Sequence, residues 1–163
     1  MQKIKPFLWF DDNAEEAVNF YTSVFKNSKI LETSRYSEEG PGPAGTVMVM
    51  SFEIEGQEYL ALNGGPHFKF NESVSFMITC ENQQEVDYFW NKLTADGGEE
   101  SMCGWLKDKF GLSWQVTPRV LMELIHDPNP EKAKRVFKAM LEMKKIDIPT
   151  LERARDGETV GSK

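Results

Sequence analysis

Two stretches of this chain repeat one order of predicted elements, and that repetition constrains the fold more than any other feature. Helical positions in the two stretches match one for one at a constant spacing along the chain. The matched positions are Asn13, Glu16, Phe20, Tyr21 and Val24 in the first stretch and Asn82, Glu85, Phe89, Trp90 and Leu93 in the second. The turn Glu55-Gly56-x-x-Tyr59 likewise matches Phe110-Gly111-x-x-Trp114. Because two separate segments match, we interpret the pattern as a tandem repeat rather than as two similar helix caps.

The first copy is predicted to contain a strand, a helix and three further strands. Residues 4–10 form a short apolar and aromatic run typical of a strand. The helix predicted over residues 13–26 has Asn13 as its N-cap, with Glu16 three residues later as in a capping box. Turn residues separate the later strands, which are predicted over residues 29–36, 46–55 and 57–63.

The second copy ends in a strand, a tight turn and another strand over residues 103–116. Before this hairpin, a strand is predicted over residues 73–80 and a helix from Asn82 to about Ala95. The hairpin turn is Asp108-Lys109-Phe110-Gly111, whose glycine can adopt a positive φ. Alternation then gives the last strand an apolar face and a polar face. If the polar face lines a pocket, a ligand would contact Trp105, Ser113 and Gln115.

The C-terminal part differs from both copies, because two helices separated by Asp127-Pro128-Asn129-Pro130 are predicted there. The apolar stripe of the second helix is expected to cover the rest of the domain or a second subunit. We therefore divide the chain into a domain of residues 1–118, a helical extension and a disordered tail. Their bounds are 3–64 for module one, 72–118 for module two, 119–156 for the extension and 157–163 for the tail.

Composition excludes several classes of function. The formal net charge of -7, without a clustered basic face, argues against nucleic-acid binding and is compatible with a cationic or neutral small ligand. The two cysteines, Cys80 and Cys103, form no C-x-x-C pair and no cluster with His67 or His126, which disfavours a zinc site. The first apolar run is too short to span a membrane or to serve as a signal segment, so we expect a cytoplasmic protein.

The combination of motifs resembles the vicinal-oxygen-chelate superfamily, which includes glyoxalase I, ring-cleaving dioxygenases, and fosfomycin and bleomycin resistance proteins. More narrowly it resembles the PhnB-like branch, often labelled 3-demethylubiquinone-9 3-methyltransferase. The matching stretches are Pro6-Phe7-Leu8-Trp9-Phe10, residues 14–21, Leu62-Asn63-Gly64-Gly65-Pro66 and residues 103–111. The resemblance implies an α+β fold of tandem βαβββ modules, with an eight-stranded curved sheet around a cavity plus C-terminal helices. It also implies a homodimer.

In the metalloenzymes of this superfamily, each of four strands supplies one metal ligand. The resemblance places these positions at Pro6, Leu60, Ser73 and Gln115. Proline and leucine offer no donor, serine is a poor ligand, and one amide oxygen does not hold a divalent ion. We therefore expect no metal and no other cofactor. The methyltransferase label also lacks support, because no glycine-rich turn follows the first strand.

The resemblance and the alternation of the strands together assign the two faces of the sheet. We expect the helix-covered face to carry Phe7, Trp9, Val74, Phe76, Trp114 and Val116. The predicted ligand-binding residues are Leu8, Phe10, Ser73, Ser75, Cys103, Trp105, Ser113 and Gln115. This lining predicts binding of a small hydrophobic or aromatic molecule in a metal-free cavity, with catalytic residues unknown. The alternative is an enzyme of the same superfamily (a glyoxalase, dioxygenase or transferase) with an atypical metal site or metal-independent pocket residues.

Overall fold

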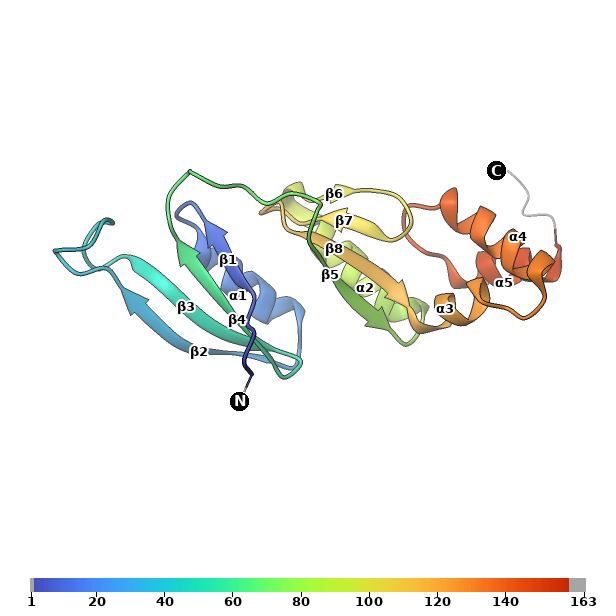
Figure 1. The fold of residues 1–163 in the computed structure, drawn as a ribbon, viewed down its shortest axis with the longest axis horizontal. Coiled ribbons are helices and arrows are strands. Elements are labelled where there is room, and N and C mark those ends of the chain that lie inside the picture. Colours follow the sequence, from blue (N-terminus) through green and yellow to red (C-terminus); the bar gives the residue numbers. More distant parts are fainter. Residues whose placement is uncertain (1, 159–163) are drawn as a thin grey trace. The chain divides into compact units, whose positions relative to one another are not determined.

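The computed structural model describes residues 2–158, which divide into two compact units after Phe70 (Figure 1). The first unit has the order strand, helix, strand, strand, strand. Its elements are β1 (Phe7–Phe10), α1 (Ala14–Val24), β2 (Ser28–Arg35), β3 (Val47–Ile54) and β4 (Gln57–Asn63). The strands form one sheet in the order β1-β4-β3-β2. Within it, β1 runs parallel to β4 and the other neighbouring pairs are antiparallel.

Helix α1 covers one face of this first sheet, and aromatic rings lie at the centre of the contact. Tyr21 of α1 stacks on Phe52 of β3 with ring centroids 6.2 Å apart, and Phe52 stacks on Tyr59 of β4 at 5.4 Å. All three side chains are buried. Because large rings remove much apolar surface from water, this face forms the core of the first unit.

The second unit repeats the order of the first. Its elements are β5 (Ser75–Cys80), α2 (Gln83–Thr94), the 3₁₀ turn η1 (Ala95–Gly97), β6 (Glu99–Glu100), β7 (Trp105–Lys107) and β8 (Ser113–Pro118). The sheet order is β5-β8-β7-β6, with β5 parallel to β8. Helix α2 buries Val86, Trp90 and Leu93 against one face of this sheet. The repeated βαβββ order confirms the predicted α+β tandem fold.

The connections between the first strand and the helix differ in length between the two units. Three residues, 11–13, separate β1 from α1, whereas two residues, 81–82, separate β5 from α2. The two helices correspond at the spacing predicted from the repeat, with Ala14 opposite Gln83. The first strands are offset by one further position, with Phe10 opposite Cys80.

Strand pairing supports this additional offset of the first strands. In the first sheet Phe7 pairs with Leu60, and in the second Met77 pairs with Gln115. Leu60 and Gln115 are the positions that the repeat itself makes equivalent, so their partners Phe7 and Met77 are equivalent as well. Side chains alternate between the two faces along a strand. An alignment of the two modules by their helices is therefore one residue out at the first strand and assigns its residues to the opposite face.

The two helices also begin with different caps. At α2 the backbone N–H of Glu85 donates to Asn82 Oδ1 at 3.0 Å, and the Glu85 carboxylate accepts the backbone N–H of Glu81 at 2.8 Å. This confirms the cap predicted at Asn82. The capping box predicted at Asn13 is wrong, because Asn13 makes no side-chain cap bond and Ala14 N–H donates to Asn63 Oδ1 of β4 at 2.8 Å. The longer connection lets β4 supply the cap.

The predicted hairpin turn joins β7 to β8 and is organised by one buried carboxylate. Asp108 is 2% exposed, and its Oδ1 accepts the backbone N–H groups of Phe110 at 2.9 Å and Leu112 at 3.1 Å. Its Oδ2 accepts the indole N–H of Trp114 at 2.9 Å. Gly111 adopts a φ of +85° in this turn, a conformation that glycine takes without strain because it has no Cβ. These bonds fix the corner from which β8 begins.

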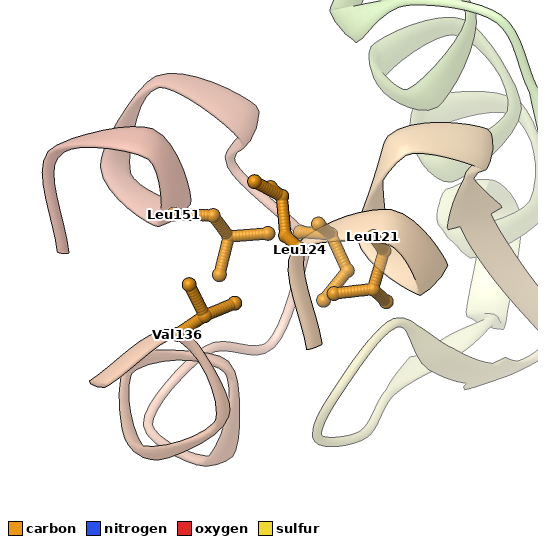
Figure 2. Packing of buried hydrophobic residues seen from close by; sticks show 5 residues of the cluster. Leu121, Leu124, Val136 and Leu151 are labelled. Carbon is orange, nitrogen blue, oxygen red and sulfur yellow. The ribbon is translucent and has the colours of Figure 1, made fainter. Parts of the chain in front are cut away.

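Three helices follow β8 and pack on one another. They are α3 (Arg119–Ile125), α4 (Pro130–Leu141) and α5 (Ile148–Asp156). Figure 2 shows leucine and valine side chains from all three helices pointing toward one another. This cluster of buried residues consists of Leu121, Leu124, Val136, Ile146 and Leu151. The extension therefore has a small apolar core of its own.

Backbone and amide hydrogen bonds attach these helices to the second βαβββ module. Gly104 N–H donates to Lys144 O at 2.7 Å, and a side chain on Gly104 would meet a backbone oxygen of β8 at 2.8 Å. At the start of α2, the Gln83 amide accepts Ile148 N–H at 2.8 Å and donates to Ile146 O at 3.1 Å. The extension thus belongs to the second unit.

The stripe of α4 that was expected to pack is only partly covered within the chain. Val136 is fully buried, whereas Phe137 and Leu141 are 49% and 50% exposed. Gly157, with φ 82°, caps the end of α5, so the predicted tail begins with an ordered residue. The part of that tail from residue 159 onward lies outside the described residues. Within residues 2–158, no helix is long and apolar enough to cross a membrane.

Candidate functional site

The face of the second sheet opposite α2 carries most of the polar and aromatic residues predicted to bind a ligand. We call it the open face and define it by Ser75, Met77, Trp105, Lys107, Ser113 and Gln115. Strand register aligns these residues in two rows across β5, β8 and β7. One row is Met77, Gln115 and Trp105, and the other is Ser75, Ser113 and Lys107. The alternate residues of β8, Trp114 and Val116, are buried on the α2 side.

Hydrogen bonding on the open face is incomplete. Gln115 Nε2 donates to Ser75 Oγ at 2.9 Å, which links two of the strands and orients the amide. Ser113 is 1% exposed, and its Oγ has no hydrogen-bond partner among the described residues. Buried hydroxyl groups in folded proteins are normally satisfied, so Ser113 stands out within this surface.

A cavity of about 360 Å³ lies beside Ser113 and Trp105. Its lining residues are Glu72, Glu99, Glu100, Ser101, Trp105, Leu106, Lys107 and Ser113. Lys107 Nζ lies 3.1 Å from a carboxylate oxygen of Glu72 and 3.1 Å from one of Glu99. Hydrogen bonds to these two carboxylates, Glu99 first, raise the pKa of Lys107, and the bond from Lys107 lowers the pKa of Glu72. These charged residues were not predicted to line a site, because their pairing depends on how the strands form the sheet.

Of the eight predicted ligand-binding residues, the structure brings four together on the open face. These are Ser75, Trp105, Ser113 and Gln115. Ser73 instead lies in the turn before β5, where its backbone N–H donates to Asn71 Oδ1 at 3.0 Å. Cys103 lies before β7, and its thiol contacts Met140 O of α4 at 3.6 Å. It packs against the helical extension.

The predicted face of β1 is wrong. Leu8 and Phe10 are 6% and 3% exposed and lie on the α1-covered side of the first sheet, within the core. Register shows this, because Leu8 pairs with Ala61, two residues from the core residue Tyr59 on the same strand. Phe7, expected under the helix, is 55% exposed on the opposite face. The extra residue between β1 and α1 accounts for the exchange.

Two residues expected under helices are also placed differently. Val74 precedes β5 and is 64% exposed. Trp9 lies on the face of the first sheet opposite α1, where its Nε1 donates to Gly65 O at 2.8 Å and its ring meets Phe68 edge-on at 5.0 Å. A side chain on Gly64 would collide with the Trp9 ring at 2.3 Å. Trp9 is therefore held by the loop that follows β4.

The first unit contains a second cavity, of about 620 Å³, that sequence reasoning missed. It lies between the end of β1 and the glycine- and proline-rich loop after β2. Tyr36 donates to Asn63 O at 2.6 Å, and a side chain on Gly42 would lie 2.5 Å from the Tyr36 ring. Asp11, Asp12 and His67 also line this cavity. The available signal in the sequence was the run Gly40-Pro41-Gly42-Pro43, which lies in this loop.

Cysteine chemistry distinguishes the two thiols. Cys80 is fully buried, and burial, with smaller contributions from the carboxylates of Glu85 and Glu81, raises its pKa to about 12. Because the thiolate is the reactive form, Cys80 should stay unmodified at pH 8 while half-buried Cys103 reacts. We expect mass spectrometry after iodoacetamide treatment to find one label on the folded protein, absent from Cys103→Ala, and two labels in urea. Equal labelling of both thiols in the folded protein would contradict this prediction.

Two solved structures of low sequence identity share the fold. A fosfomycin resistance protein, FosX, from Listeria monocytogenes has a TM-score of 0.51 at 16% identity, covering 76% of this chain and 97% of that one. A Pseudomonas aeruginosa protein has a TM-score of 0.59 at 20% identity, covering 72% and 98%. Both likenesses concern the fold alone.

The particular family follows from closer matches. The sequence model of the family described as 3-demethylubiquinone-9 3-methyltransferase matches residues 2–117. The PhnB protein from Bacillus cereus is 42% identical with a TM-score of 0.66, and the match covers 72% of this chain and 99% of that chain. This chain therefore belongs to the 3-demethylubiquinone-9 3-methyltransferase (PhnB-like) family. No curated protein matches the sequence.

The residues do not fit the metal site that the superfamily implies. The first-strand positions inferred from the resemblance were Pro6 and Ser73, but strand pairing places Phe7 beside Leu60 and Met77 beside Gln115. Among these four, only the Gln115 amide offers a hard oxygen donor, and one amide oxygen does not hold a divalent ion. Within residues 2–158, no three His, Cys, Asp or Glu side chains are grouped so that they could hold a metal ion.

Proposed function

We propose that this protein binds a small hydrophobic or aromatic molecule on the open face of its second module. The observation that carries the proposal is the half-buried Trp105 of β7 beside a cavity of about 360 Å³. The open-face residues of the neighbouring strands β5 and β8 are neutral. A cavity of this size suits a small organic molecule, and an indole ring offers a flat apolar surface for stacking.

A methyl-transfer role, which the family's name denotes, has little support in these residues. A nucleotide-type cofactor is commonly held by a glycine-rich turn after the first strand of a parallel sheet. Here β1 runs into Asp11-Asp12-Asn13, and only one neighbouring strand pair in each sheet is parallel. The proposal therefore takes no step through a methyl donor.

Ligand titration of a tryptophan variant tests the binding proposal. Benzyl alcohol and toluene serve as neutral aromatic probes, and NMR chemical-shift changes report binding. Replacing Trp105→Ala removes the stacking surface and should weaken binding of both probes about 3- to 10-fold, whereas Trp105→Phe should retain most of it. Unfolding curves check that the variants are folded. Binding that is unchanged in Trp105→Ala, or absent from the wild-type protein, contradicts the proposal.

The homodimer implied by the superfamily resemblance belongs to the same proposal, because an apolar ligand site gains protection from water when a second chain covers it. Half-exposed Phe137 and Leu141 of α4 add apolar surface to the second unit. Sedimentation velocity at micromolar concentration should show a dimer. A monomer at that concentration would contradict this part of the proposal and leave the ligand site untouched.

A further inference from the structure

We propose that the cavity beside Trp105 prefers neutral ligands that carry a hydroxyl or carbonyl oxygen to anionic ligands, and that Ser113 binds this oxygen. The inference rests on the proposed function and deepens it, since it names the polar group of the ligand and the residue that recognises it.

The first support is the unsatisfied hydroxyl of Ser113. Its Oγ is buried and has no partner among the described residues, and Ser113 is one of the residues that line the cavity. A hydroxyl can donate one hydrogen bond and accept two, and leaving it unpaired away from water costs free energy. A ligand oxygen that pairs with Ser113 Oγ removes this cost, so binding gains more from a polar ligand than from its apolar analogue.

The second support is the pairing of the charges around the cavity. Lys107 Nζ is shared by Glu72 and Glu99, each at 3.1 Å. Glu100 accepts the Trp90 indole N–H at 2.9 Å and lies 3.5 Å from Lys144 Nζ. The pairing leaves the lining with more carboxylates than ammonium groups, because Lys107 serves both Glu72 and Glu99. An anionic ligand would meet this excess of negative charge, whereas a neutral ligand would not.

The third support is the position of Ser113 in the sheet. It pairs in register with Lys107 on β7 and lies two residues from Gln115, which pairs with Trp105. Successive residues on the same face of a strand lie about 7 Å apart. A ring stacked on Trp105 can thus present a substituent one or two bonds long toward Ser113. This spacing matches a benzyl-type alcohol or an aryl carbonyl compound.

Four compounds that differ in one group test the inference. Benzyl alcohol, toluene, benzylamine and sodium benzoate share the ring and differ in hydrogen bonding and charge. In the wild-type protein at pH 7, NMR titration should give benzyl alcohol a dissociation constant about 3- to 10-fold below that of toluene. Benzoate, as an anion, should bind more weakly than both benzyl alcohol and cationic benzylamine.

Two serine variants locate the effect. Ser113→Ala should abolish the preference for benzyl alcohol over toluene, while Ser37→Ala, at an exposed serine outside this lining, should preserve it. Because the Ser113 hydroxyl has no partner among the described residues, Ser113→Ala should not lower the unfolding midpoint. A lower midpoint would mean that the protein itself uses this hydroxyl, and it would overturn the inference.

The outcomes separate this inference from the proposed function. Equal affinity for benzyl alcohol and toluene, a preference that survives Ser113→Ala, or tighter binding of benzoate than of benzyl alcohol overturns the inference. In each of these cases a loss of affinity in Trp105→Ala would still support an aromatic site. No binding of any compound overturns both.

Discussion

Replacing Asp108→Ala is expected to lower the free energy of unfolding of the second unit by about 3–5 kcal/mol. The buried carboxylate accepts two backbone N–H groups and the indole N–H of Trp114, and alanine would leave all three donors without this acceptor. Urea unfolding followed by tryptophan fluorescence measures the change.

The isosteric variant Asp108→Asn provides the matched control. Its single amide oxygen can still accept the two backbone bonds at 2.9 and 3.1 Å, but its NH₂ group cannot accept from Trp114. We expect a loss about half that of Asp108→Ala. If alanine costs less than about 1 kcal/mol, the corner is held by packing rather than by this carboxylate.

Ile146→Ala is expected to cost about 2–5 kcal/mol, as for other large-to-small changes at fully buried sites. Ile146 belongs to the apolar core of the helical extension, its carbonyl accepts from Gln83, and its side chain lies against Gly104. The change therefore weakens both the extension and its attachment to the sheet.

Leu141→Ala is the control for this prediction, because Leu141 lies in the same extension but is 50% exposed. A surface truncation of this kind should change the free energy of unfolding by about 0.5 kcal/mol or less. Calorimetry measures both variants. Similar losses for the two would show that the buried cluster does not stabilise the unit more than its surface does.

The element order and the hairpin could be predicted from the sequence because each has a local physical signal. Helical spacing identified α1 and α2, and alternation in residues 112–117 identified the two faces of β8. The Asp108-to-Gly111 turn was recognisable because the glycine permits a positive φ, which the structure confirms at Gly111. The four open-face residues predicted on β5, β7 and β8 follow from the same alternation.

The face of β1 could not be predicted, because the connection to α1 contains one residue more than its counterpart. Helix positions Ala14 and Gln83 keep the spacing of the repeat, so helical matches alone gave no sign of the shift. Because side chains alternate along a strand, this shift of one residue put Leu8 and Phe10 on the wrong face in the prediction. Strand pairing, which a single sequence does not contain, was needed to detect it.

Contacts between distant segments account for the other differences. The contact of Cys103 with Met140 and the ion pairs of Lys107 with Glu72 and Glu99 depend on how the chain returns to β7. The burial of Ser113 has the same origin. Alternation predicted its face, but not that its hydroxyl would be enclosed without a partner among the described residues.

The attachment of the helices to the sheet has a consequence for sequence divergence within the family. The family match ends at residue 117, and the Bacillus cereus chain is 99% covered by 72% of this one. In a homologue that ends near this point, the partners of Gln83 and Gly104 would be missing. The amide at position 83 should therefore be inherited together with the C-terminal helices. Where the helices are lost, position 83 becomes free to vary, whereas Gly104 should remain because a side chain there would meet a backbone oxygen of β8 at 2.8 Å.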